Sequence, residues 1–526
     1  MKEKIRYILY VVMASLLTIP ACAQSKKDSE AAMRKLQIAE YAITNLYVDT
    51  VDETKLVEDA IRGMLEKLDP HSSYSSPKEV QQMNEPLQGN FEGIGVQFNM
   101  VEDTLLVIQT VSGGPSEKMG ILAGDRIVSV NDSAIAGVKM AREEIMRRLR
   151  GPKGTKVVLG VIRPGIADKL SFTITRDKIP LHTIDATYML RPTIGYIRIG
   201  SFGATTHEEF RESLKQLLAQ GMQTLVLDLQ ENGGGYLHAA VEVANELLHN
   251  GDLIVYTDGR SARRSEYKAT GGGLFTEGKV VVLVDSYTAS AAEIVSGAIQ
   301  DHDRGIIIGR RTFGKGLVQR PLDLPDGSMI RLTIAHYYTP SGRCIQKPYE
   351  KGKGKDYAMD VVNRLKSGEL MSADSVHFVD SLKYYTLKEH RVVYGGGGIM
   401  PDEFVPLDTT KFSHFYRELA AKSILINQNL RWTDSHRKQL KAKYSTFADF
   451  REHFEIPQDL INAIIKEGEK QKVVPKDDAE LQQTLPYLRR QLKALIARDL
   501  WTINEYFDII NEQSDIVQRA LQIIKE

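Results

Sequence analysis

The sequence predicts a multidomain α/β protein with helical segments at both ends, and three observations support this. The chain has 526 residues, which is too long for one ordinary domain. Its middle part alternates apolar, strand-like runs with helical patterns, which indicates an α/β core. Residues 26–88 and 408–526 instead carry apolar side chains at helical spacing. Three or four domains are therefore expected.

Residues 1–23 have the pattern of a secretory signal peptide. A basic start precedes the apolar stretch Tyr7–Ile19, which is too short for a good membrane span. Ala23 ends a small-x-small cleavage site, whereas Cys22 lies in a weak lipoprotein box and would then carry the lipid. Pro20 lies inside that box, where proline is unusual, so plain cleavage is favoured. We expect secretion across the inner membrane, to give a periplasmic protein or one tethered to the membrane through Cys22.

The composition excludes several classes of partner and cofactor. The 68 basic and 68 acidic residues cancel, so the chain has no electrostatic footprint for nucleic acid. After cleavage Cys344 would be the single cysteine, and no internal disulfide could form. A His-Glu-x-x-His motif and a zinc-type cysteine spacing are both absent from the sequence. We expect no metal and no cofactor.

A buried strand that turns into a helix lies at the centre of the predicted core, residues 177–407. Val280–Val284 is an uninterrupted apolar run, as in a strand buried on both faces, and helix-forming residues begin at Ala289. Ser290 therefore lies at a helix start, where unpaired backbone N–H groups favour a developing oxyanion. A nucleophilic serine needs a base. Lys315, between Gly314 and Gly316, is the next candidate, since burial can leave a lysine neutral.

Taken singly, Ser290 would be a helix cap and Lys315 a surface lysine. Together, Thr-Ala-Ser-Ala-Ala-Glu and Phe-Gly-Lys-Gly-Leu-Val-Gln, with Lys315 25 residues after Ser290, resemble the active site of the C-terminal processing (tail-specific) serine peptidases. The resemblance extends over roughly residues 35–405. It implies that Ser290 is the nucleophile, that Lys315 is the general base and that Gln319 supports the lysine. Glu293 also matches a glutamate of the family motif.

The same resemblance implies an oxyanion hole. The family usually has Asp-Leu-Arg-x-Asn-Pro-Gly-Gly where this chain has Asp-Leu-Gln-Glu-Asn-Gly-Gly-Gly, residues 228–235. Gln230 and Gly233 thus replace an arginine and a proline, which calls the rigidity of this loop into question. The N–H groups of Gly234 and Ala291 are the expected oxyanion donors. A phosphate-binding interpretation of the glycines is weak, because no P-loop lysine follows them.

Residues 90–176 resemble a PDZ domain, through an ordered series of short strands, a short helix near Gly114–Gly120 and an amphipathic helix at Ala141–Arg150. In that fold the loop Gly93, Ile94, Gly95 and Val96 would present N–H groups to the terminal carboxylate of a peptide, which adds as a strand to the sheet. The resemblance implies a PDZ (α+β) domain joined to a ClpP/crotonase-like peptidase core.

The sequence thus predicts a secreted serine endopeptidase with a Ser–Lys dyad, acting on proteins or peptides with free apolar C-termini. Two alternatives remain open. A catalytically inactive PDZ-containing peptide-binding protein would keep the scaffold without the reaction, although the presence of both Ser290 and Lys315 argues against it. A hydrolase with a histidine base would use His336. Homo-oligomerisation and the role of residues 408–526 also remain open.

Overall fold

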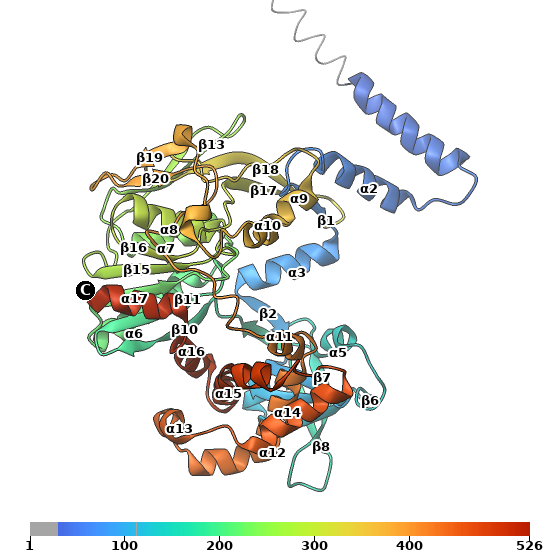
Figure 1. Ribbon diagram of the computed structural model, residues 1–526. Coiled ribbons are helices and arrows are strands. Elements are labelled where there is room, and N and C mark those ends of the chain that lie inside the picture. The colour runs from blue at the N-terminus through green and yellow to red at the C-terminus, as the bar shows by residue number, and fades with distance from the viewer. Residues whose placement is uncertain (1–29, 112, 526) are drawn as a thin grey trace, which may run out of the picture. The chain divides into compact units, whose positions relative to one another are not determined.

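The computed structural model of the protein describes residues 30–111 and 113–525 (Figure 1). The predicted signal peptide and Cys22 lie outside these residues. The described chain falls into two compact units. The first contains residues 30–77, 320–332 and 349–357, and the second contains the other described residues.

The first unit is built from helices and a short strand pairing. Residues 30–46 are helical, and helix α2 (Glu53–Leu65) begins at Asp52, whose carboxylate accepts the Lys55 N–H at 3.1 Å. Strand β1 (Ser73–Ser75) pairs antiparallel with the start of β18 (Met329–Tyr338), and helix α9 (Gly354–Ala358) follows later in the chain.

The predicted PDZ segment is a sheet with two helices. It follows helix α3 (Pro77–Gln88) and strand β2 (Asn90–Gly93), which pairs with β9 (Asp177–Pro180). The sheet order is β3-β4-β5-β7-β8, with β6 beside β5, and the elements are β3 (Val96–Val101), β4 (Thr104–Thr110), α4 (Pro115–Lys118), β5 (Arg126–Val130), β6 (Ser133–Ala134), α5 (Arg142–Leu149), β7 (Lys156–Ile162) and β8 (Leu170–Thr175). The strands and helices that we expected here are confirmed.

A six-stranded sheet forms the core that carries Ser290, in the order β10-β11-β12-β15-β16-β21. All its neighbouring strands are parallel except β10 and β11. The strands are β10 (Ile184–Arg191), β11 (Ile194–Ile199), β12 (Thr224–Asp228), β15 (Lys279–Val284), β16 (Ile306–Gly309) and β21 (Glu403–Phe404). Alternate residues enter two separate apolar clusters, because successive side chains of a strand point to opposite faces. Leu225 and Leu227 belong to one cluster, whereas Val226 belongs to the other.

Helices cover both faces of this sheet, as near-continuous apolar strands require. One face packs against α6 (Thr206–Ala219), α7 (Leu237–Asn245) and α8 (Ala291–Asp301). The other face packs against α17 (Asp515–Lys525), which lies against β15 and β16 (Figure 1). Smaller elements complete the core: β13 (Leu253–Asp258), β14 (Ser265–Lys268), β17 (Leu317–Asp323), α10 (Asp360–Lys366), β19 (Lys383–Tyr385) and β20 (Val392–Tyr394).

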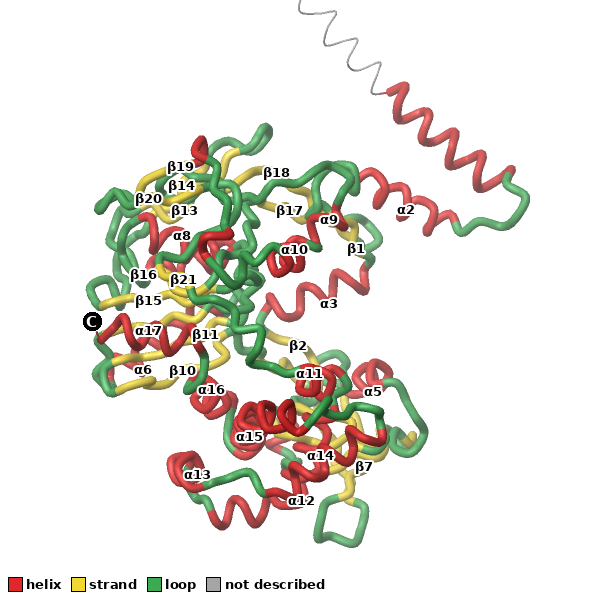
Figure 2. The backbone as a smooth tube through the Cα atoms, in the orientation of Figure 1, coloured by secondary structure: helices red, strands yellow, loops and turns green. Residues whose placement is uncertain are grey.

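The expected C-terminal helical segment is confirmed (Figure 2). Its helices are α11 (His414–Ala421), α12 (Ile424–Lys443), α13 (Phe447–His453), α14 (Gln458–Lys470), α15 (Asp478–Leu500) and α16 (Ile503–Asn511). Helices α11 to α16 share an apolar cluster of their own. Helix α16 also contacts β10, so this segment is joined to the core by α16 as well as by α17.

Candidate active site

Ser290 lies at the predicted junction between strand and helix. Strand β15 ends at Val284, a tight turn follows, and α8 begins at Ala291. Ser290 has φ 56° and ψ −114°, a backbone conformation that non-glycine residues rarely adopt. Backbone strain of this kind, at a sharp turn between a strand and a helix, is a feature of exposed nucleophiles. It persists only where neighbouring groups fix the strained conformation.

The turn before Ser290 is held by side chains of its own. The Asp285 carboxylate accepts the N–H groups of Tyr287 and Thr288 at 2.9 and 3.0 Å. The Thr288 hydroxyl donates to the Leu229 carbonyl at 2.8 Å, which ties the turn to the residue after β12. The Ala289 N–H donates to the Asn232 carbonyl at 2.9 Å. The turn before the serine is thus bonded to the loop of residues 228–235, here called the glycine loop.

A buried carboxylate joins the serine to the lysine. Glu293, in the first turn of α8, is fully buried, and burial raises the pKa of its carboxyl while four hydrogen bonds lower it. Its Oε2 accepts the Ser290 N–H at 2.8 Å and the Lys315 N–H at 2.9 Å. Its Oε1 accepts the Thr312 hydroxyl at 2.5 Å and the Gly314 N–H at 2.7 Å. One side chain therefore fixes both residues of the predicted dyad.

Lys315 is half-buried in the loop of residues 312–316, here called the lysine loop. Both flanking glycines are needed, because a Cβ on Gly314 would lie 3.0 Å from the Gly398 N atom and a Cβ on Gly316 would lie 2.8 Å from the Gln346 N atom. The Tyr337 hydroxyl lies within hydrogen-bond distance of the carbonyls of both Ser290, at 3.0 Å, and Lys315, which share its single proton. The backbones of the two dyad residues are thus brought together by two independent side chains.

Gln319 lies on β17, which begins two residues after Lys315. Its side-chain amide donates to the Thr333 hydroxyl at 3.3 Å. The expected role of Gln319 in supporting the lysine stays a prediction.

The two expected oxyanion donors lie beside the serine. Gly234 has φ 96°, and a Cβ there would lie 2.7 Å from the Ser290 Cβ and 2.9 Å from the Ala291 N atom. The Gly234 N–H, however, donates to the Asn232 Oδ1 at 2.8 Å. An oxyanion must share this donor or take it from Asn232, a point that the sequence did not indicate.

The geometry disfavours the histidine alternative. His336 is exposed on β18, and its neighbour Tyr337 is the residue that points to Ser290. Successive side chains of a strand point to opposite faces, so His336 points away from the serine.

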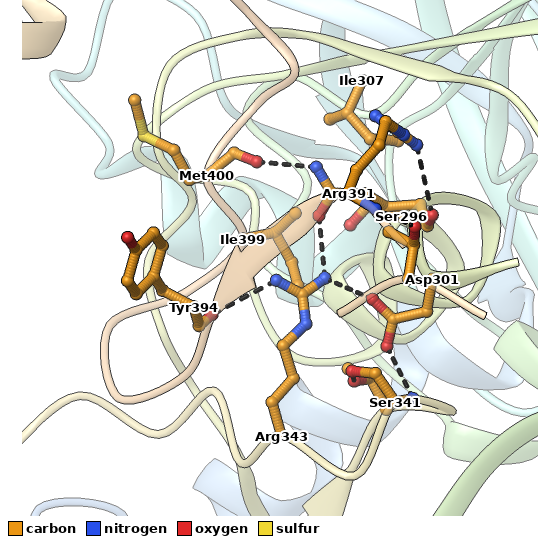
Figure 3. A network of polar contacts seen from close by, with 12 residues as sticks. Ser296, Asp301, Ile307, Ser341, Arg343, Arg391, Tyr394, Ile399 and Met400 are labelled. Atoms are coloured by element: carbon orange, nitrogen blue, oxygen red, sulfur yellow. Dashed lines mark hydrogen bonds and ion pairs between the residues drawn. The ribbon is translucent and has the colours of Figure 1, made fainter. Parts of the chain in front are cut away.

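The far end of the serine helix is anchored by a buried arginine that sequence reasoning missed (Figure 3). Arg343 is completely buried and donates to Asp301 Oδ1 and Gln300 Oε1, both at 2.7 Å, and to the Tyr394 carbonyl at 3.2 Å. Asp301 also accepts the Ser341 N–H at 2.9 Å. The motif Tyr-Tyr-Thr-Pro-Ser-Gly-Arg, which ends at Arg343, was the available signal.

The predicted peptide-binding loop follows β2. Gly95 has φ 73°, and Ile94 is buried. Strand β3 begins at Val96 and lies at one end of its sheet. Among the described residues, one of its two edges is therefore unpaired. The Arg142 guanidinium, at the start of α5, lies over the Phe98 ring of β3 at 5.3 Å. An edge strand beside a helix is the arrangement that strand-addition recognition uses.

The described residues hold no group of three or more His, Cys, Asp or Glu side chains placed to bind a metal. In the same part of the chain, no helix combines the length and the apolarity needed to cross a bilayer.

Curated relatives settle the family. Carboxy-terminal processing protease CtpB of Bacillus subtilis is 34% identical over 335 residues, which cover 62% of this chain and 68% of that protein. The carboxy-terminal-processing protease of Bartonella bacilliformis is 35% identical over 354 residues, covering 65% and 80%. Residues 193–358 match peptidase family S41. The chain belongs to this family of carboxy-terminal processing proteases.

Other matches divide this S41 peptidase further. Residues 93–175 match the PDZ domain, residues 11–78 match the N-terminal domain of activating protease CtpB, and residues 415–502 match a family of unknown function (DUF8443). Among solved structures, the photosystem II D1 C-terminal processing protease is 31% identical, covers 59% of this chain and 88% of its own, and has a TM-score of 0.33. The predicted fold class, a PDZ domain joined to an α/β peptidase core with helical segments, is confirmed.

Proposed function

We propose that this S41 peptidase is a secreted endopeptidase in which Ser290 and Lys315 form a catalytic dyad. The observation that carries the proposal is the Glu293 carboxylate, whose Oε2 accepts the N–H groups of both residues. Ser290 attacks the peptide carbonyl, and a neutral Lys315 takes the serine proton and returns it to the leaving amine. The N–H groups of Ala291 and Gly234 hold the oxyanion; a free donor contributes about 3 kcal/mol on the usual mutational scale, and Gly234 contributes less because its N–H is shared with Asn232.

The experiment is digestion of an unfolded protein mixture, with the new termini identified by mass spectrometry. Ser290→Ala and Lys315→Ala should each abolish cleavage while the protein remains folded. Ser296→Ala is the matched control, because this serine lies on the same helix and its hydroxyl, among the described residues, bonds only with the carbonyls of Ala292 and Glu293. Unchanged cleavage by either dyad variant would refute the dyad. An inactive wild-type protein would favour a peptide-binding role instead.

We further propose that the PDZ domain recognises substrates by a free C-terminus with an apolar last side chain. The unpaired edge of β3 next to α5 and the loop of residues 93–96 support this. The N–H groups of such a loop suit a carboxylate and lose that partner when the peptide is amidated. One peptide is therefore compared in its free and amidated forms. A higher kcat/KM for the free form is expected, and equal values would remove the role.

We also infer export directed by residues 1–23. The apolar run and the cleavage-site pattern support this inference. N-terminal sequencing of the protein isolated from cells would identify the mature end. Cleavage after Ala23 gives a periplasmic protein, whereas a lipid-modified Cys22, lost in Cys22→Ala, gives a membrane-tethered one. An intact Met1 would refute export by this route.

A further inference from the structure

The glycine loop lacks the arginine that the family motif has, and Gln230 stands in its place. Gln230 folds back on Asp228, with its N–H and its side-chain amide donating to Asp228 Oδ1 at 2.9 and 3.1 Å. Asp228, at the end of β12, is only 1% exposed. A buried carboxylate is stabilised by an opposite charge as well as by hydrogen bonds, and an amide supplies no charge.

A guanidinium reaches the carboxylate from the next strand. Arg198 on β11 is the parallel register partner of Asp228, and its side chain is 10% exposed. Its Nη1 donates to Asp228 Oδ2 at 2.9 Å, and its Nη2 donates to the Gln230 carbonyl and to Glu231 Oε2, each at 3.0 Å. Arg198 therefore pairs with Asp228, whose Oδ2 also accepts the Tyr196 hydroxyl at 2.5 Å, and it fixes the backbone of the next residues.

The residues that follow Gln230 connect Arg198 with Ser290 through hydrogen bonds and contacts. The Glu231 N–H donates to Asp285 Oδ1 at 3.1 Å, in the turn that precedes Ser290. The buried Asn232 donates its amide to the Ile199 carbonyl at 2.7 Å and accepts the Gly234 N–H. Gly234 lies against Ser290. Three residues therefore separate the Gln230 carbonyl, which Arg198 holds, from Gly234, which contacts the nucleophile.

The C-terminal helices cover Arg198 from the other side. The Phe507 ring of α16 lies under the guanidinium, 4.8 Å from Cζ to the ring centroid. Helix α16 is fixed to β10 at both ends, since the Asn504 Oδ1 accepts the Thr187 N–H and the Asn511 amide donates to the Tyr188 hydroxyl, each at 2.8 Å. A guanidinium held on an aromatic ring and excluded from water loses rotational freedom, so its N–H groups stay aligned with their acceptors.

We propose that Arg198 is the positioning residue of the glycine loop, supplying from the neighbouring strand the guanidinium that the family motif carries within the loop, and that the C-terminal helical segment acts on catalysis through Phe507. The proposal rests on the proposed function, because the loop it positions is the expected oxyanion loop. It gives the C-terminal segment a role at the active site.

The test combines kinetics with hydrogen exchange of the full-length protein. Arg198→Met should lower kcat by at least about tenfold with a much smaller change in KM, because positioning acts on the reaction step. Amide exchange, measured by mass spectrometry, should speed up in the peptide that contains residues 229–235. Gln230→Arg, added to Arg198→Met, restores the family residue and should recover most of kcat and slow the exchange again. Phe507→Ala should also lower kcat and speed up exchange of residues 229–235, but less than Arg198→Met does.

Arg211→Met is the matched control. It removes a guanidinium from another buried carboxylate, Glu246, which does not contact the glycine loop. It should lower the unfolding temperature without speeding exchange at residues 229–235. If Arg198→Met fails to fold, the wild-type protein is compared with the double variant and with Arg198→Lys. Arg198→Lys keeps the positive charge but lacks the planar guanidinium that bonds two partners at once.

Two results would overturn the proposal. One is unchanged exchange at residues 229–235 in the folded Arg198 variants. The other is a double variant that folds but recovers neither kcat nor exchange protection. The exchange readout needs no substrate, so it tests the positioning role even if the wild-type protein cleaves nothing. That outcome would refute the proposed function alone.

Discussion

Replacing Glu293 by glutamine should loosen the lysine loop against the start of α8 without creating a cavity. The carboxylate accepts four donors, two on each oxygen, and an amide can accept on one oxygen only. In the less costly orientation the new NH2 faces Thr312, whose hydroxyl can turn to accept, and the Gly314 N–H is left without an acceptor. One orphaned buried donor, together with the loss of charge assistance in the remaining bonds, should cost about 2–4 kcal/mol of the free energy of unfolding.

The effect on catalysis should exceed what this loss of stability explains. The orphaned Gly314 N–H lies next to Lys315, so a relaxation of about 1 Å in the lysine loop should lower kcat by about a hundredfold. The assay is kcat and KM on one peptide substrate, together with thermal unfolding. Glu246→Gln is the control, because Glu246 is equally buried and binds His207, Arg211 and the Leu274 N–H. It should lose stability and keep kcat. A Glu293→Gln protein with wild-type kcat, or an equal loss in the control, would refute the reasoning.

Three further predictions concern neighbouring groups. Burial lowers the pKa of Lys347 to about 8, and Asp360 opposes this shift only partly. Between pH 8 and the ordinary pKa of 10.5, the lysine therefore binds more protons in the unfolded state than in the folded state. The free energy of unfolding should consequently rise with pH across that window. Denaturation measured at several pH values should show this rise in the wild-type protein, and Lys347→Met should remove the contribution of Lys347 to it. Gly234→Ala should lower kcat by at least about tenfold, because the new Cβ would overlap the Ser290 Cβ and the φ of 96° adds strain of about 1–3 kcal/mol; a kinetic assay with wild-type kcat would contradict this. Tyr337→Phe should lower the free energy of unfolding by about 1–2 kcal/mol in chemical denaturation, because the hydroxyl bridges the carbonyls of Ser290 and Lys315; an unchanged stability would contradict it.

The local parts of the site could be predicted from the sequence. The run Val280–Val284 followed by small helix formers predicted the junction at Ser290, and the structure places that junction between β15 and α8. Patterns of this kind depend on neighbours in the chain, where periodicity and turn residues carry the information. The glycines around Lys315 likewise indicated a close approach of backbones, which the contacts of Gly314 and Gly316 show.

The connections between distant segments could not be predicted. Glu293 was recognised as a motif residue, but its bonds to Thr312 and Gly314 depend on how α8 and the lysine loop lie together in space. Arg198 gave no signal, because its partner Asp228 lies on another strand and the pairing depends on the register between β11 and β12. The same holds for α17, because helical spacing within residues 408–526 does not indicate which surface each helix covers.

The sheet that carries the nucleophile is closed by segments that follow Ser290 and Lys315 much later in the chain. Its edge strand β21 comes from residues 403–404, the lysine loop is bonded to Ile399, and one face is covered by Ile516, Val517, Ala520 and Leu521. Contacts between residues so far apart in sequence form slowly, after the loops between them have closed. A nascent chain that already contains Ser290 and Lys315 still lacks these pieces. The sheet beside Ser290 and Lys315 can therefore be completed only after residues 399–404 and 516–521 have been made, which delays the assembly of the site during synthesis.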